Sequence, residues 1–320
     1  MIADRAPAAR PGASVSMTAA PVRRARRRRI PMLPYLLVAP AVILMIVIAL
    51  YPTIYAVQLS LYDVNLARYN RARFVGLDNY WKLLFDDQVF RVSVLQTLRW
   101  VGVVIVGQLG LALPVALFLN MKFTFRGFIR TAILIPWVIP AAVTSLIWVF
   151  MFDANLGVAN DILVRLGIIE TYWTWLSDFK TAFFLVVMAA VWSGFPFMSI
   201  VLLAALQGIP EEMYEAAKID GAGVWARFLH ITLPMLVPTI LLILLLRTIW
   251  LSHSVDLVYI MTVGGPGYSN YTTAVYSFLL TTSQFEIGYA SAVAVVLAVV
   301  LLAVSTIYVR QMERSQEYLR

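Results

Sequence analysis

Four residues of one apolar stretch have the spacing of a single helical face. They recur at i, i+3, i+4 and i+7, and residues at this spacing lie on one side of a helix: Arg247, Trp250, Leu251 and Ser254. A guanidinium at such a depth binds a ligand, snorkels to the membrane interface or pairs with an acidic group on another helix, and these roles stay open. The indole of Trp250 suits stacking on the apolar C–H face of a sugar, although a tryptophan in an apolar helix more often serves packing. Asp256 is a further polar candidate nearby.

The residues that enzymes use for catalysis do not form a recognisable set. The acidic pairs Asp86–Asp87 and Glu211–Glu212 are sequence neighbours, so their side chains would point about 100° apart on a helix. The chain has no cysteine and two histidines, which argues against a transition-metal site. It also lacks the GxxxxGK[ST] loop that cradles phosphates. We therefore expect no enzyme, no metal and no cofactor bound by this chain.

Six apolar segments would position the polar residues. Hydrophobic residues make up 61% of the 320 residues, more than a soluble core of this size uses. Each segment exceeds the roughly 20 helical residues that cross a hydrocarbon core, and a helix satisfies its own backbone in lipid. Prolines such as Pro136 and Pro140 predict kinks. The sequence thus predicts an all-α membrane protein over residues 30–320, with helices at about 33–57, 92–119, 129–152, 181–206, 235–259 and 287–309.

The charges predict an orientation in the membrane. Residues 1–29 hold eight of the 25 Lys and Arg residues and lack apolar periodicity, so we expect a disordered basic tail. A basic tail beside the first membrane helix explains the net charge of +8 better than nucleic-acid binding does. With this tail in the cytoplasm, 16 Lys and Arg fall on the cytoplasmic side and eight on the other. The positive-inside rule therefore predicts a multi-pass protein with both termini in the cytoplasm.

One polar, helix-forming stretch interrupts the apolar segments between Ile209 and Pro238. Pro210 suits the first helical position, and Glu211 and Glu212 place negative charge at the positive end of the helix dipole. Gly221 then loosens the backbone before a second short helical run. Because this stretch falls on the cytoplasmic side, we expect it to bind a soluble partner.

The same stretch carries a motif. Glu215-Ala216-Ala217, followed by Gly221, Ile231, Leu233 and Pro234, reproduces the pattern EAA-x3-G-x9-I-x-L-P. It resembles the signature of inner-membrane permease subunits of binding-protein-dependent ABC importers. Its full form, EAAKIDGAGVWARFLHITLP, is similar to the carbohydrate branch, which includes the maltose and glycerol-phosphate importers. The resemblance implies that residues 209–233, here called the coupling segment, together with the next residue, contact an ATPase through Glu215, Ala216, Ala217, Asp220, Gly221, Ile231, Leu233 and Pro234.

The resemblance also implies a substrate path. The run Trp192–Phe197, WSGFPF, is similar to the family's W-x-G-F-P-[YF], whose pocket positions fall on Ser193, Gly194 and Phe197. The face formed by Arg247, Trp250, Leu251 and Ser254 corresponds to one that lines the sugar pocket of maltose-type permeases. Leu251 and Ser254 stand where that type has asparagines, so this face offers fewer hydrogen bonds and the resemblance leaves the identity of the sugar open. The class of solute stays open between monosaccharide, disaccharide, oligosaccharide and polyol phosphate.

The expected assembly follows from the same resemblance. A type I ABC importer permease has six transmembrane helices and a cytoplasmic coupling helix, and it forms half of a translocation path in the inner membrane of a bacterium or archaeon. We expect a second homologous permease, usually a different chain, two ATPase subunits that hold ATP and Mg, and an extracytoplasmic solute-binding protein that delivers sugar. The alternative is an ion-coupled secondary carrier, which would need ionisable groups spread through its helices.

Overall fold

The structure is a computed structural model that describes residues 33–67 and 72–317. By its contacts the chain divides into two units, Met1–Leu50 and Tyr51–Arg320. The described part of the first unit is helical, with α1 (Leu33–Met45) followed by the π-helix η1 (Ile46–Leu50). Its apolar side chains from Leu36 onward are largely exposed, which suits contact with lipid tails. The predicted basic tail, residues 1–29, lies outside the described residues.

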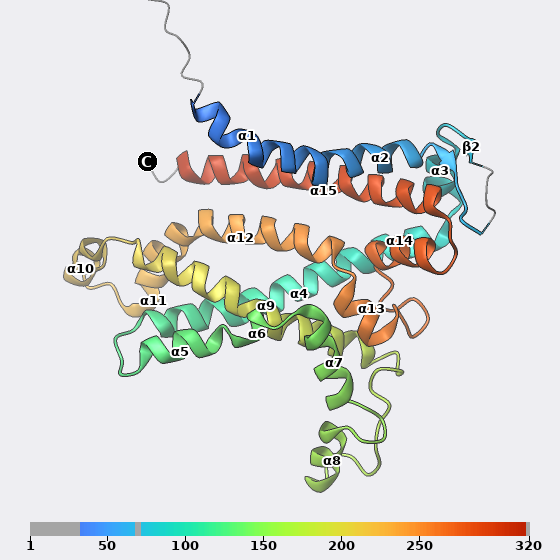
Figure 1. Ribbon diagram of the computed structural model, residues 1–320. Helices are drawn as coiled ribbons and strands as arrows, with labels where there is room; N and C mark the ends of the chain where they lie inside the picture. The colour runs from blue at the N-terminus through green and yellow to red at the C-terminus, as the bar shows by residue number, and fades with distance from the viewer. Residues whose placement is uncertain (1–32, 68–71, 318–320) are drawn as a thin grey trace, which may run out of the picture. The chain divides into compact units, whose positions relative to one another are not determined.

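The second unit contains four long helices, several short ones and one β-hairpin (Figure 1). The long helices are α4 (Gln88–Asn120), α9 (Ala182–Gln207), α12 (Leu233–His253) and α15 (Ile287–Glu317). The shorter helices are α2 (Tyr51–Leu59), α3 (Asp78–Trp81), η2 (Lys82–Asp86), α5 (Arg126–Ile133), α6 (Ile135–Val138), α7 (Ala141–Met151), α8 (Val158–Arg165), α10 (Glu211–Ile219), α11 (Val224–Arg227), η3 (Phe228–Thr232), α13 (Asp256–Thr262) and α14 (Thr273–Thr282). The strands β1 (Tyr62–Asp63) and β2 (Arg73–Phe74) pair antiparallel.

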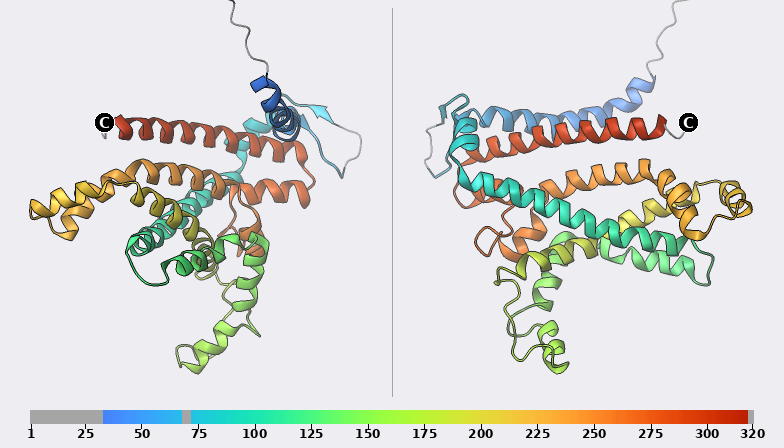
Figure 2. Two further views of the ribbon diagram at one scale, coloured as in Figure 1. Left: turned by 60° about the vertical axis from the view of Figure 1, so that its left-hand side comes forward. Right: turned by 180° about the vertical axis from the view of Figure 1, so that it is seen from behind.

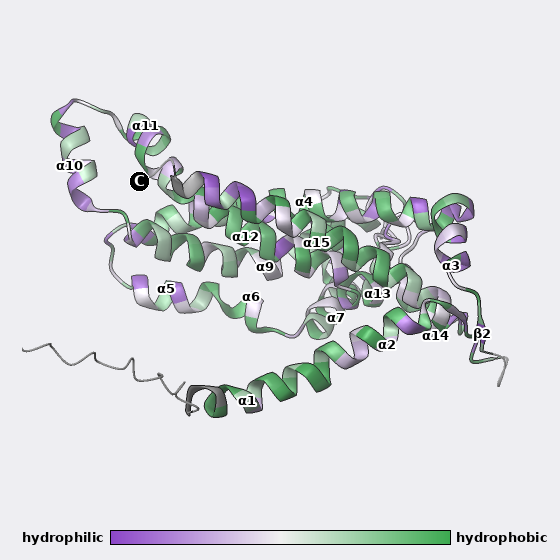
Figure 3. Ribbon diagram, turned by 90° about the horizontal axis from the view of Figure 1, so that it is seen from above, coloured by the Kyte–Doolittle hydropathy of each residue, from purple (hydrophilic) through white to green (hydrophobic). Residues whose placement is uncertain are grey.

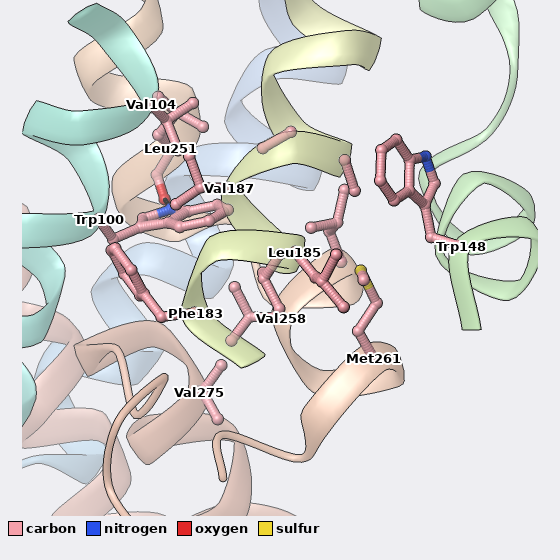
Figure 4. Packing of buried hydrophobic residues seen from close by; sticks show 14 residues of the cluster. Trp100, Val104, Trp148, Phe183, Leu185, Val187, Leu251, Val258, Met261 and Val275 are labelled. Carbon is pink, nitrogen blue, oxygen red and sulfur yellow. Dashed lines mark hydrogen bonds between the residues drawn. The ribbon is translucent and has the colours of Figure 1, made fainter. Parts of the chain in front are cut away.

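The core of the second unit lies where α9 packs against α4 and α12. α9 is the most buried of the long helices. In its most apolar stretch 56% of the residues are buried, against 22% in the corresponding stretch of α4. One cluster of buried side chains joins Trp100 of α4, Phe183 of α9 and Leu251 of α12 (Figure 4). The indole N–H of Trp100 donates to the carbonyl of Leu251 at 3.2 Å. Such close van der Waals packing is what holds helices together in lipid.

Five of the six predicted membrane spans are confirmed as long apolar helical runs: Leu36–Leu59, Gln88–Asn120, Ala182–Gln207, Val224–His253 and Ile287–Arg314. The third, predicted as one helix over 129–152, is instead a pair, Arg126–Val138 and Ala141–Met151, bent by 88°. Pro140 caps α7, and Ile139 before it is extended with ψ 127°. Proline lacks a backbone donor and disfavours helical conformation in the preceding residue, so the helix breaks there. The kink predicted for the third segment is therefore a full break of 88°, and the bent pair makes the sixth span when its halves count together.

The fifth predicted helix, 235–259, is also divided. α12 ends at His253, because Ser254 is extended with ψ 122°. A new helix, α13, begins at Asp256. Asp256 therefore belongs to a different helix from Arg247, while Ser254 marks the end of the predicted face.

Most of the short elements lie at two ends of the second unit, while α7 and α8 project to one side of it (Figures 1 and 2). α10, α11, the start of α5 and the last turns of α15 lie at one end. The β-hairpin, α3, α13 and α14 lie at the other. Viewed from above, α10 carries hydrophilic turns, whereas the long helices are mostly apolar (Figure 3). This grouping is the one that the sequence predicts for loops on opposite sides of a membrane.

The carboxylate of Asp87 links three helices at the end of the second unit that carries the β-hairpin. Asp87 caps α4, because its Oδ1 accepts the N–H of Phe90 at 2.9 Å. Its Oδ2 accepts the hydroxyls of Tyr276 and Tyr289 at 2.6 and 2.7 Å. Burial raises the pKa of Asp87, but the hydrogen bonds from Tyr276, Phe90 and Tyr289 outweigh it and hold the pKa below 3.8. The ionised carboxylate thus ties α4 to α14 and α15.

Candidate functional site

The coupling segment forms the helix–turn–helix that the sequence predicts. Pro210 was predicted to be the first residue of this helix. It is instead the N-cap, because α10 begins at Glu211. Glu211 and Glu212 lie in the first turn, where the helix dipole favours negative charge, and Lys218 lies in the last. Within α10 only Tyr214 and Ala217 are partly buried. The helix therefore presents most of its surface, Glu215 and Ala216 included, to the surroundings.

Gly221 makes the turn after α10. Its φ is +79°, in the left-handed region that side chains with a Cβ disfavour. The N–H of Ala222 donates to the carbonyl of Ala217 at 2.8 Å, and the N–H of Gly221 donates to that of Lys218 at 3.0 Å. These two bonds are the Schellman arrangement that ends a helix. The motif glycine thus sets the direction in which the chain leaves α10, and Asp220 before it is exposed.

The coupling segment exposes apolar side chains beside a groove. Ile219, Val224 and Trp225 are between 70 and 86% exposed. The groove, about 840 Å³, lies between α10–α11 and the ends of α4 and α9. The hydroxyls of Tyr214 and Thr232 are 3.0 Å apart and link α10 to η3. A protruding segment with several large unburied apolar residues is typical of a surface that a partner covers.

The remaining motif residues begin α12. Ile231 lies in η3 and is partly buried, and Leu233 and Pro234 are the first two residues of α12. Pro234 lies where the π-helix η3 passes into α12 within the continuous helical run Val224–His253, a place where the backbone hydrogen-bond register changes. The motif therefore runs from the exposed helix α10 into the membrane helix that carries Arg247.

Arg247 is buried beside an amide, and this partner was not predicted. Its Nε donates to Oε1 of Gln108 at 2.8 Å, and Nε2 of Gln108 donates to the carbonyl of Ala190 at 2.7 Å. Arg247 is 8% exposed and Gln108 is fully buried. Gly194 provides the space, because a Cβ there would overlap both side chains. Arg247, Gln108 and Gly194 are called the Arg247 cluster below. Gln108, a polar residue inside an apolar segment, was the available signal.

An aromatic row lies next to this cluster. Trp137, Phe197 and Trp250 form it, with ring centroids 5.5 and 5.4 Å apart in that order. The guanidinium carbon of Arg247 lies 5.8 Å from the ring of Trp250. Trp137, at the bent third segment, was not predicted as part of the site. Trp137 and Trp250 are both exposed on this chain, so the row forms an open aromatic surface.

The other predicted path residues are placed differently. Ser193 is partly buried and donates to the carbonyl of Ala190 at 3.2 Å. Leu251 is buried in the core cluster of Figure 4, although it is on the same helix as Arg247. Ser254 is partly buried at the end of α12, and Asp256 is exposed at the start of α13. The structure thus brings Gly194, Phe197, Arg247 and Trp250 together and leaves the rest around them.

The part of the chain that the structure describes has no candidate metal site. Residues 33–67 and 72–317 contain no group of three or more His, Cys, Asp or Glu side chains that could hold an ion. The one ion pair among these residues is Arg165–Asp161, an exposed pair on α8. An acidic partner for Arg247 is therefore not found among the described residues.

The sequence matches the family described as binding-protein-dependent transport system inner membrane component over residues 108–317. The chain is 38% identical over 279 residues to the sulfoquinovosyl glycerol transport system permease protein SmoG of Agrobacterium fabrum, which covers 87% of this chain and 90% of that protein. It is 35% identical over 280 residues to the trehalose/maltose transport system permease protein MalF of Thermococcus litoralis, with 87% and 92% covered.

A chain of a bacterial alginate ABC transporter has a similar fold. That transporter was solved in complex with an alginate pentasaccharide-bound periplasmic protein. The two chains superpose with a TM-score of 0.72 at 24% identity, covering 88% of this chain and 94% of the other. At this identity the likeness concerns the fold, and it confirms the expected ABC importer permease architecture.

Proposed function

Because this chain belongs to the family of binding-protein-dependent transport system inner membrane components, we propose that it is the permease subunit of an ATP-driven sugar importer. The relatives at 38% and 35% identity are named for sulfoquinovosyl glycerol and for trehalose and maltose, which supports sugar as the substrate class. The family assignment gives no support to the alternative of an ion-coupled carrier. One observation carries the coupling role: a coupling segment that protrudes from one end of the bundle with its apolar residues unburied.

The partner of the coupling segment is an ATPase subunit. Ile219, Val224 and Trp225 supply apolar contact, and Glu215 and Lys218 on α10 supply charge around it. Burial of exposed large apolar side chains is the main favourable term in most protein associations. ATP and Mg are held by two such ATPase subunits and not by this chain.

The remaining partners complete the importer. A second homologous permease, a different chain in the usual arrangement, forms the other half of the path. An extracytoplasmic binding protein delivers the sugar, and the relative of known structure was solved with such a periplasmic protein. The excess of Lys and Arg in the segments that the sequence assigns to the cytoplasm supports an inner-membrane protein with both termini in the cytoplasm.

Transport follows from movement of the coupling segment. When ATP draws the two ATPase subunits together, the docked coupling segments approach each other, and the bundle changes from inward-facing to outward-facing. This is rigid-body switching between two packings, biased by a ligand that binds one of them better. Sugar in the path contacts the aromatic row and the Arg247 cluster, and Ser193, Ser254 and Asp256 lie along it. Binding there must be weak enough for release.

The docking claim is tested by Ile219→Asp. Ile219 is 86% exposed, so the change costs the isolated fold little and places a charge in the docking surface. The matched control is Leu156→Asp, a residue 90% exposed in the loop before α8. We expect the first variant to insert normally but to lose ATPase co-purification and ATP-driven sugar uptake, and the second to keep both. Normal ATPase association of Ile219→Asp would refute the docking surface, and sugar uptake without any ATPase would refute the importer itself.

A further inference from the structure

The Arg247 cluster holds a charge that the described chain does not neutralise. The neighbour on Nε is the neutral amide of Gln108, whose own N–H is committed to Ala190. Among residues 33–67 and 72–317 no acidic side chain lies within ion-pair distance of Arg247. A charged side chain at this position in a membrane helix is costly and usually faces a cavity or a partner. The positive charge therefore calls for a counter-charge from outside the described chain.

The guanidinium is held in a way that leaves its end free. Of its nitrogens, Nε is bonded to Gln108, while Nη1 and Nη2 have no hydrogen-bond partner among the described residues. Both nitrogens keep some accessible surface, although Arg247 as a whole is only 8% exposed. Two free N–H groups at the end of a planar fork match the two oxygens of a carboxylate or sulfonate. Gln108 thus holds the fork at Nε, and Gly194 packs against Nη2 without using either Nη group as a hydrogen-bond donor.

The free end of the fork lies beside the aromatic row. Trp250 is 5.8 Å from the guanidinium carbon, and Phe197 and Trp137 continue the row. Aromatic rings offer an apolar surface to the C–H face of a sugar ring. A solute that uses both features at once carries an anionic group next to a sugar ring.

We propose that Arg247 binds an anionic group of the transported solute, so that this importer selects acidic saccharides over neutral ones of the same size. The inference rests on the proposed function in sugar import and adds the charge of the substrate. The competing explanation is an acidic residue of the second permease that pairs with Arg247 when the complex forms. That explanation makes Arg247 a requirement for assembly, whereas a substrate role leaves assembly intact.

The test uses the complete complex, with ATPase subunits and binding protein, reconstituted in vesicles. ATP-driven uptake is measured for matched glycosides that differ only at C6: a methyl glucuronide or methyl 6-deoxy-6-sulfoglucoside against methyl glucoside, and the same pairs as disaccharides. Two variants remove the free charge in different ways. Arg247→Gln deletes it, and Gln108→Glu places a carboxylate on Nε without removing the arginine. The control is Arg99→Gln, which removes a cation that lies 3.8 Å over the Phe183 ring of the core.

We expect the wild type to import an anionic member at least ten-fold faster than its neutral counterpart. Both cluster variants should lower that uptake about ten- to hundred-fold, the range for a hydrogen bond to a charged group, and still assemble. Arg99→Gln should keep the preference. Equal uptake of neutral and anionic members, or anionic uptake at the wild-type rate by Arg247→Gln, overturns the proposal. Loss of assembly in Arg247→Gln with normal anionic uptake in Gln108→Glu also overturns it, in favour of a partner's acid. ATP-driven uptake of neutral sugars alone refutes only this inference, whereas no ATP-driven uptake of any saccharide refutes sugar import as well.

Discussion

Replacing Gly221 by alanine adds a Cβ to a residue whose φ is +79°. No atom lies within 4 Å of the position that this Cβ would take, so the cost comes from the backbone conformation and not from a clash. The left-handed conformation costs an alanine roughly 1–2 kcal/mol relative to glycine. If the coupling segment relaxes into another conformation to avoid this cost, the docking-competent form falls about 5- to 30-fold.

The assay is ATPase co-purification and ATP-driven uptake for a series at position 221. Asparagine tolerates the left-handed region better than alanine, and a β-branched valine tolerates it worst. We therefore expect activity to fall in the order glycine, asparagine, alanine, valine. Because asparagine is larger than alanine, a steric effect at the docked surface predicts that asparagine is the worse of the two.

The control is Gly223→Ala, two residues away in the same turn. Gly223 has a φ of −65°, and its Cβ position is also free of neighbours. The same methyl group at an ordinary φ should leave coupling close to the wild-type level. If Gly221→Ala docks and transports normally, or if Gly223→Ala is equally damaging, the backbone argument is wrong.

Three further predictions concern the rest of the second unit. Gly194→Ala should lower the thermal unfolding midpoint, because its Cβ would overlap Gln108 and such overpacking costs about 1–3 kcal/mol; an unchanged midpoint would contradict the close packing. Trp250→Ala should lower sugar uptake about two- to ten-fold while the complex still assembles, since the aromatic row loses one ring; normal uptake would remove the row from the path. Asp87→Asn should lose about 3 kcal/mol at pH 7, because hydrogen bonds to a charged group are replaced. Because folding lowers the pKa of Asp87, its contribution to the free energy of unfolding is present above pH 3.8 and is lost as the pH falls through the folded pKa. The thermal unfolding midpoints of wild type and variant should therefore converge in acid. A difference that stays constant with pH would contradict this.

Most of the correct predictions came from two features of the sequence: the motif of the coupling segment and the lengths of the apolar segments. Glu215 to Pro234 lie within one local stretch, and helix caps, glycines and prolines act over a few residues. The turn at Gly221 was therefore predictable from its residue type. A proline inside an apolar segment predicts that the helix bends there, but it does not predict the angle of the bend. Pro140 was expected to kink the third segment, and the chain instead turns by 88° there, with α7 packed beside α13.

The contacts that the sequence could not predict join distant segments. Gln108 and Arg247 are 139 positions apart, and neither residue type implies the other. A buried arginine suggested an acid as its partner, and an amide took that place. Asp87 was considered only for acid–base chemistry with its neighbour Asp86, yet its partners are two tyrosines far along the chain. Pairings of this kind depend on which helices pack together, and periodicity within one helix carries no information about that.

The two parts of the site are joined by one helix. α12 begins at Leu233, the last leucine of the coupling motif, and reaches Arg247 about 21 Å further along at 1.5 Å per residue. Its start is linked to α10 through the hydroxyls of Tyr214 and Thr232, and Arg247 near its other end is bonded to Gln108 of α4. If α12 moves as one body, with no bend at Pro238, a displacement of α10 that moves Thr232 also moves the guanidinium relative to α4 and α9. We therefore propose that motion of the coupling segment alters the path at the Arg247 cluster, because its short hydrogen bonds and close packing against Gly194 leave little room for a shift without breaking a contact.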